Sequence, residues 1–228
     1  MGTWVQVPCT GRAGDYDRVL RELERRDVLS RVWQRDHTLW GERPDGIANR
    51  LGWLDAPSRA AMHLAEWGSL AREIGAEGLR DVVLLGMGGS SLAAEVLVAA
   101  QGRLGGYPFE PRADGPSLRI GDSTEPAAVH DLEQGLRLDR TLFVSASKSG
   151  TTLETSALTG HFLERCRAAL GHVEAGRRFV AITDEGSALE RDARELGFRA
   201  IVHGEPDIGG RFSALSAFGL LPPWLVGV

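Results

Sequence analysis

From about residue 80 onward, short β-rich runs alternate with longer stretches of helical character. Five such runs stand out, at residues 82–85, 118–120, 141–145, 179–182 and 199–202. The segments between them are long enough for crossover helices, which parallel strands need in order to pair. The sequence therefore predicts an α/β fold, in which a doubly wound, Rossmann-like, five-stranded parallel sheet carries helices on both faces.

The part before residue 80 has a helical period and is rich in tryptophan. It holds five of the six tryptophans: Trp4, Trp33, Trp40, Trp53 and Trp67. A stripe typical of one buried helix face follows at Ala60, Leu64, Trp67, Ala71 and Ile74. We expect these aromatic side chains to be core and packing surface. Residues 1–78 are accordingly expected to form a helical segment that packs on a sheet domain at residues 79–228.

Several helix starts carry local signals. Thr151-x-x-Glu154 and Ser187-x-x-Glu190 have the spacing of capping boxes, and Pro126 suits a first helical turn. These signals place helices directly after three of the predicted strands.

Composition excludes several classes of function. The net charge is -5 and no basic cluster is longer than a pair, so we expect neither nucleic-acid nor membrane-surface binding. The two cysteines and six histidines have no metal-ligand spacing, and we predict no metal and no cofactor. Without a signal peptide or a membrane-length apolar run, the expected location is the cytoplasm.

Two loops after strands have the composition of ligand-binding loops. The first, residues 86–91, reads Gly-Met-Gly-Gly-Ser-Ser and resembles a dinucleotide fingerprint, but Ser91 replaces the third glycine. A nucleotide-binding oxidoreductase would also need a ribose-binding acid, for which only Asp122 is available. The second loop, residues 145–152, has hydroxyls, Lys148 and a glycine that could surround a phosphate, without Walker A spacing. The alternative to phosphate binding is that this loop only caps the following helix and that Lys148 is solvated.

In a third segment, residues 207–213, two glycines directly precede an arginine. Gly209 and Gly210 allow a ligand to come close to the backbone, and Arg211 supplies a fixed positive charge. This combination indicates a small anionic substrate.

These three segments together resemble phosphoglucose isomerase. The resemblance rests on Val82 to Ser91, on the Ser-Lys-Ser-Gly-Thr-Thr-x-Glu-Thr run at residues 147–155, and on Asp207 to Leu221. Residues 47–54 add a softer likeness to the isomerase part of bifunctional transaldolase/phosphoglucose isomerase proteins. The resemblance implies a sugar-isomerase (SIS) fold, no cofactor, a homodimer, and interconversion of glucose 6-phosphate and fructose 6-phosphate through an enediol(ate) in glycolysis and gluconeogenesis.

The resemblance also implies roles for individual residues. Arg211 matches the active-site arginine that stabilises the enediolate, and Gly88 and Gly210 would contact the substrate. The phosphate would lie among Gly89, Ser90, Ser147, Lys148, Ser149 and Thr152.

In the family, the base glutamate, a ring-opening histidine and a late lysine follow the arginine motif, whereas this sequence ends seventeen residues beyond Arg211. We therefore expect a fragment with a first SIS domain and no second one, inactive if the base lies elsewhere. A carboxylate within the chain, Glu154 or Asp122, is the other candidate base. The alternative function is a non-catalytic, sugar-phosphate-binding SIS regulatory module.

Overall fold

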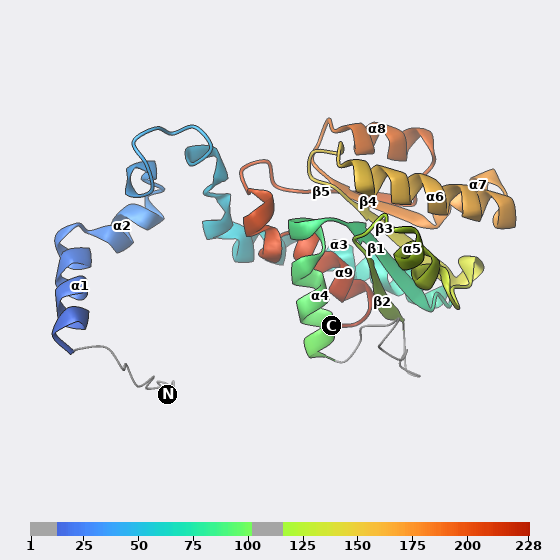
Figure 1. Cartoon of the computed structure of the whole chain (residues 1–228), viewed down its shortest axis with the longest axis horizontal. Helices are drawn as coiled ribbons and strands as arrows, with labels where there is room; N and C mark the ends of the chain where they lie inside the picture. Colours follow the sequence, from blue (N-terminus) through green and yellow to red (C-terminus); the bar gives the residue numbers. More distant parts are fainter. Residues whose placement is uncertain (1–12, 102–115) are drawn as a thin grey trace. The chain divides into compact units, whose positions relative to one another are not determined.

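The computed structural model describes residues 13–101 and 116–228 (Figure 1). By its internal contacts the chain divides into two compact units, residues 1–51 and 52–228. Trp4, Cys9 and the glycine-rich connection at 102–115 lie outside the described residues.

The first unit contains short helices. They are α1 (Ala13–Arg25), α2 (Val28–Trp33) and the 3-10 turns η1 (His37–Leu39) and η2 (Ala48–Arg50). Arg31 holds the turn after α2, because it donates to Asp36 at 2.7 Å and to Thr38 at 2.8 Å. Trp33 and Trp40 are 67% and 46% exposed, so neither is the core residue that its type suggested.

The second unit is built on a parallel sheet. Its strands are β1 (Asp81–Gly86), β2 (Ser117–Gly121), β3 (Thr141–Ala146), β4 (Phe179–Thr183) and β5 (Ala200–His203). They lie in the order β2-β1-β3-β4-β5, and every neighbouring pair is parallel. Each of the five predicted β-rich runs is a strand, and the predicted doubly wound α/β fold is confirmed.

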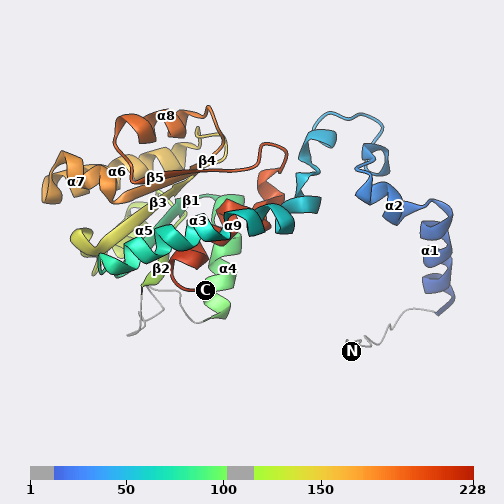
Figure 2. The same ribbon diagram turned by 180° about the vertical axis from the view of Figure 1, so that it is seen from behind.

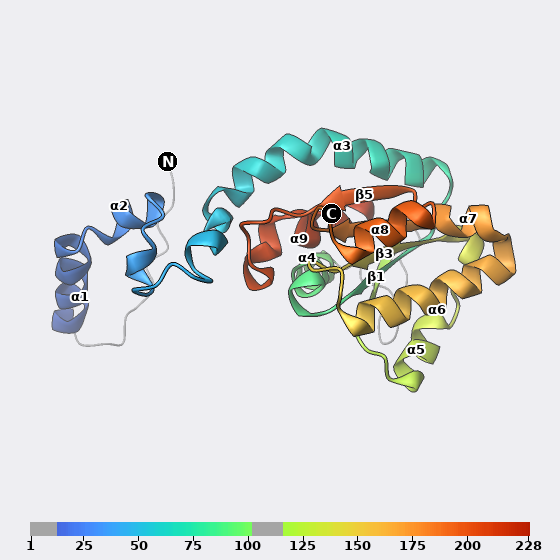
Figure 3. The ribbon, with the colours of Figure 1, turned by 90° about the horizontal axis from the view of Figure 1, so that it is seen from above.

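Helices cover both faces of this sheet, as the view from above shows (Figure 3). One layer contains α3 (Ala56–Ala76), α4 (Leu92–Ala100) and α9 (Ala217–Leu225). The opposite layer contains α5 (Pro126–Glu133), α6 (Leu153–Leu170), α7 (His172–Arg177) and α8 (Ala188–Glu195). Four 3-10 turns complete the unit: η3 (Gly52–Asp55), η4 (Gly88–Ser90), η5 (Leu138–Arg140) and η6 (Gly210–Leu215).

Two apolar cores lie between the sheet and these layers. In the first, α3 runs across the sheet (Figure 2) and buries Ala60, Trp67 and Ile74 against strand residues. The predicted stripe on α3 is thus largely confirmed, although Leu64 is 36% exposed. In the second, Phe143 stacks between Phe162 and Phe179, with ring centroids 4.8 and 4.9 Å apart.

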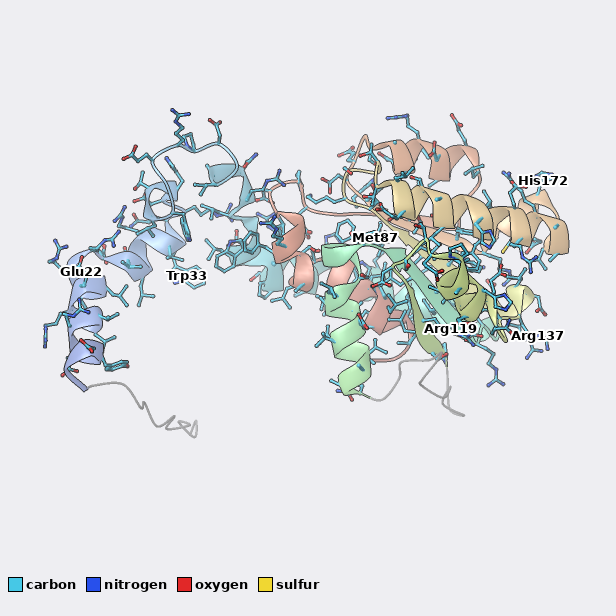
Figure 4. The ribbon with its side chains drawn as sticks, in the orientation of Figure 1. Glu22, Trp33, Met87, Arg119, Arg137 and His172 are labelled. Atoms are coloured by element: carbon cyan, nitrogen blue, oxygen red, sulfur yellow. The ribbon has the colours of Figure 1, made fainter. Side chains whose placement is uncertain are left out.

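Buried polar groups also mark the sheet. Arg119 on β2, labelled in Figure 4, donates to Asp81 at 3.1 Å where β1 begins. Burial in the second core raises the pKa of the Cys166 thiol to about 11. None of the described helices combines the length and hydropathy needed to span a bilayer. The described part of the chain contains no cluster of three metal-ligating side chains.

Trp67 should contribute strongly to the stability of the second unit. Its side chain is 2% exposed, and its indole N–H finds no hydrogen-bond acceptor among the described residues. We expect Trp67→Ala to cost about 3–5 kcal/mol of unfolding free energy. Trp67→Phe should cost much less, because no hydrogen bond is lost. Urea titration followed by circular dichroism measures both, and equal costs would contradict this account of the packing.

Candidate functional site

The two expected phosphate loops leave the sheet at the same edge. β1 and β3 are neighbours in register, with Gly86 opposite Ala146. After β1 the chain enters α4 on one face, and after β3 it enters α6 on the other. Met87, labelled in Figure 4, marks the loop after β1. Such a divergence is the topological switch point, where doubly wound sheets bind ligands beyond the carboxyl ends of their strands.

The two helices that begin at this switch point have no side-chain cap. Ser91 is the N-cap of α4 and Thr152 is the N-cap of α6, and neither side chain accepts a hydrogen bond from its helix. The capping box predicted for Thr151 and Glu154 is therefore wrong. Free N–H groups at a helix N-terminus, with the positive end of the helix dipole, attract anions.

The helices that follow β2 and β4 differ in this respect. Glu125 caps α5 by accepting from Ala128 N–H at 2.8 Å, with Pro126 in the first turn as predicted. Ser187 caps α8 by accepting from Glu190 N–H at 3.0 Å, as the second predicted capping box requires, whereas the Glu190 carboxylate accepts from the Gly186 N–H instead of the Ser187 N–H. Hydrogen bonds from Arg194 and from the Gly186 N–H lower the pKa of Glu190 to about 2. Nearby side chains thus cap the N-termini of α5 and α8, whereas the N-termini of α4 and α6 at the switch point have no such cap.

The loop after β3 arranges hydroxyl and amide donors. Ser147 and Thr152 hydroxyls lie 3.0 Å apart, as do those of Ser149 and Thr151. The N–H groups of Lys148 and Ser149 donate to no acceptor in the described chain, whereas the Gly150 N–H donates to the Ser147 carbonyl at 3.2 Å. A run of free N–H groups beside hydroxyls is a typical anion-binding concavity.

The loop that carries Arg211 is tied to the beginning of α3. Arg59 donates two hydrogen bonds to the Asp207 carboxylate, at 2.6 and 2.9 Å, and these bonds raise the pKa of the Arg59 guanidinium. The Gly52 N–H donates to the Asp207 carbonyl at 3.0 Å. No local pattern indicated the role of Arg59, which lies 148 positions from its partner.

The arginine loop also meets the loop after β1. Ser213 donates to the carbonyls of Gly89 at 3.0 Å and Gly210 at 2.7 Å. A Cβ atom on Gly89 would overlap the Gly210 carbonyl oxygen, so only glycine allows this approach. The structure thus brings Gly89 together with Gly210, two residues that the sequence placed in the site.

A groove of about 650 Å³ opens beside this contact. Its lining includes Gly88, Gly89, Gly210 and Arg211, together with apolar side chains of α4. Arg211 is exposed, and its side chain makes no hydrogen bond or ion pair with the described residues. Ser147 and Gly150 instead line a separate cavity of about 120 Å³ between α6 and α8. Ser90 follows Gly89 in η4, at the beginning of α4.

Lys148 points to neither the groove nor the free N–H groups of its loop. Its ammonium group donates to both Asp184 carboxylate oxygens, at 2.8 and 2.7 Å, and to the Glu205 carbonyl at 2.7 Å. Asp184, at the end of β4, is another residue that sequence reasoning missed. Glu154 is exposed in the first turn of α6, and Asp122 is exposed after β2.

The parallel sheet and the two loops at the carboxyl ends of β1 and β3 define an α/β protein. It is of the class that binds ligands at the switch point of such a sheet. The phosphoglucose isomerase family model matches residues 62–227, and the chain belongs to that family.

Individual relatives agree with this family. Glucose-6-phosphate isomerase from Parabacteroides distasonis is 32% identical over 181 residues, which cover 78% of this chain and 40% of that protein. A crystal structure of a hypothetical protein from Thermus thermophilus matches with a TM-score of 0.71 and 32% identity, over 91% of this chain and 46% of that one. Glucose-6-phosphate isomerase from Chlamydia trachomatis matches with a TM-score of 0.59 and 28% identity, over 74% and 30%. The matched regions cover only 34%, 40% and 31% of three of the curated relatives.

Gly89→Ala should separate the arginine loop from the loop after β1, because the added methyl group meets backbone rather than a movable side chain. We expect a loss of about 1–3 kcal/mol in unfolding free energy. Gly160→Ala is the matched control, since nothing lies within 4 Å of its Cβ position and alanine favours the α6 helix. Thermal unfolding of the two variants measures the difference, and an unperturbed Gly89→Ala would show that the loops are not in contact.

Proposed function

We propose that this chain supplies the phosphate site and the active-site arginine of a glucose-6-phosphate isomerase. The observation that carries the proposal is the pair of uncapped helices at the switch point, α4 and α6, beside a loop with free N–H groups. Together they offer amide and hydroxyl donors to one dianion, with the helix dipoles favouring its charge. The names of the relatives agree with a sugar phosphate as the ligand.

In this proposal the phosphate lies among Ser90, Ser147, Ser149 and Thr152, near the N–H groups of Lys148 and Ser149. The sugar extends along the groove toward Gly210 and Arg211. Gly210 suits close approach, because nothing described lies within 4 Å of its Cβ position.

Aldose–ketose isomerisation moves a proton between adjacent carbons through an enediolate. Holding the phosphate fixes the reacting carbons, and an arginine near the developing oxyanion stabilises it. Arg211 is suited to that task because no described carboxylate neutralises it. The proton transfer needs a carboxylate base, for which Glu154 and Asp122 are the candidates within the chain.

The direct test combines calorimetric binding of 6-phosphogluconate with a coupled assay of fructose 6-phosphate conversion to glucose 6-phosphate. Binding with turnover supports the whole proposal and places the base among these residues. Binding without turnover supports the phosphate site and assigns the base to sequence outside this chain. An absence of binding would overturn the proposal.

Removing the hydroxyl pair of the phosphate loop should weaken every phosphorylated ligand. We expect Ser147→Ala with Thr152→Val to lower the affinity for 6-phosphogluconate about tenfold or more, because hydrogen bonds to charged groups contribute about 1.5–3 kcal/mol. Thr159→Val is the control, since it breaks another hydroxyl pair, with Ser145 at 2.7 Å, between the strand and the helix on either side of this loop. Calorimetry measures the affinity of both variants for 6-phosphogluconate. Equal affinities would show that the loop is a turn without a role in binding.

Arg211→Ala should discriminate between the two ends of the ligand. 6-Phosphogluconate carries a carboxylate at the sugar end, so its affinity should fall about tenfold or more, while inorganic phosphate binds as before. Where turnover is measurable, the rate should fall by about 10²–10³. Arg80→Ala, which makes the same charge change before β1 begins, is the control. Equal losses for both ligands would assign Arg211 to the phosphate instead.

A further inference from the structure

We propose that Lys148 is a positioning residue that joins the phosphate loop to the arginine loop, and that its ammonium group does not bind the phosphate. This inference rests on the proposed function, since it concerns how that site is held together. Its starting point is the surroundings of the ammonium group, which differ from what the composition of the loop suggests.

All three N–H donors of the Lys148 ammonium group already have acceptors. A protonated lysine has three N–H donors, and here they face three acceptors within 2.8 Å: the two Asp184 oxygens and the Glu205 carbonyl. The side chains of Lys148 and Asp184 are only 18% and 26% exposed, so water competes weakly for these bonds. A phosphate could bind the ammonium group only by displacing one of these three acceptors.

Two further hydrogen bonds join the phosphate loop to the end of β4. Asp184 N–H donates to the Lys148 carbonyl at 3.1 Å, and the Thr183 hydroxyl donates to the Ser147 carbonyl at 2.7 Å. In a trans peptide the C=O and the following N–H point in opposite directions. Fixing the carbonyls of residues 147 and 148 on β4 therefore turns the N–H groups of Lys148 and Ser149 away from it, where they have no described acceptor.

The third acceptor extends this connection to the arginine loop. The Glu205 carbonyl accepts both from Lys148 and from the Ile208 N–H, the latter at 3.2 Å, so the lysine holds a turn. Gly204 packs against Asp184, with its Cβ position 3.0 Å from the Asp184 Oδ1 atom. Asp207, two residues beyond Glu205, is fixed by Arg59. The segment that leads to Arg211 is thus held by two cations, Lys148 and Arg59.

The two roles of Lys148 predict opposite effects of a change at Asp184. If Lys148 positions the loops, Asp184→Asn and Lys148→Met remove the same connection, and each should weaken 6-phosphogluconate binding about tenfold. The double variant should then be no weaker than the singles. If Lys148 is a phosphate ligand, Asp184→Asn releases its ammonium group and should leave binding unchanged or strengthen it. Lys148→Arg keeps a cation that can reach the carboxylate, and should retain most of the affinity under the positioning role.

The experiment is isothermal calorimetry with 6-phosphogluconate on these four variants, together with hydrogen exchange of residues 203–212. Arg199→Met is the matched control, because it removes another two-bond ion pair, with Glu77 at 2.6 and 2.7 Å, near the opposite ends of the strands. It should lower the unfolding temperature while changing the affinity by less than about twofold.

Faster exchange of residues 203–212 in Lys148→Met and Asp184→Asn, but not in Arg199→Met, is the expected companion result. Unchanged or stronger binding by Asp184→Asn, or unchanged hydrogen exchange in both site variants, would overturn the positioning role. Failure of the wild-type chain to bind would overturn the proposed function alone, because the exchange measurement still tests the connection.

Discussion

The pairing of β1 with β3 is the constraint on which the rest of this molecule depends. Because these two strands are neighbours while their following helices lie on opposite faces, two helix N-termini open at one edge of the sheet. No single loop creates the candidate site. It arises where Gly86 and Ala146 end adjacent strands in register and the chain turns away in both directions. A shift of this register would separate the two loops whatever their composition.

Little of the positive charge at the carboxyl ends of β1 and β3 comes from lysine. In the proposed function, the positive ends of α4 and α6, the free N–H groups and the hydroxyls bind the anion, whereas the ammonium group of Lys148 is neutralised by Asp184. Neutral donors fixed by secondary structure need no reorganisation when a ligand binds. A flexible lysine would have to give up side-chain entropy each time. In the proposed function, this arrangement leaves Arg211 as the cation for the reacting end of the substrate.

The fold could be predicted because its determinants are local. Buried parallel strands such as 82–85 and 179–182 are short apolar runs between crossover segments, and Ser187 with Glu190 satisfies a helix end within four residues. The same spacing failed at Thr151 and Glu154, because Thr152 and not Thr151 is the N-cap of α6, and the Thr151 hydroxyl pairs with Ser149 instead. Local spacing cannot reveal which N-termini tertiary structure leaves open for a ligand.

The contacts of the arginine loop were beyond sequence reasoning for a related reason. Between β5 and η6 the chain has no regular structure to fix its course, so its position depends on residues far away in sequence: Lys148, Arg59 and Gly89. Two of these contacts come from cationic side chains, and the third excludes any side chain at Gly89. A loop fixed by three distant contacts carries Arg211 in a set position without pairing it to a carboxylate. In the proposed function, these contacts to its loop, rather than a partner for its own side chain, keep that arginine available for a developing negative charge.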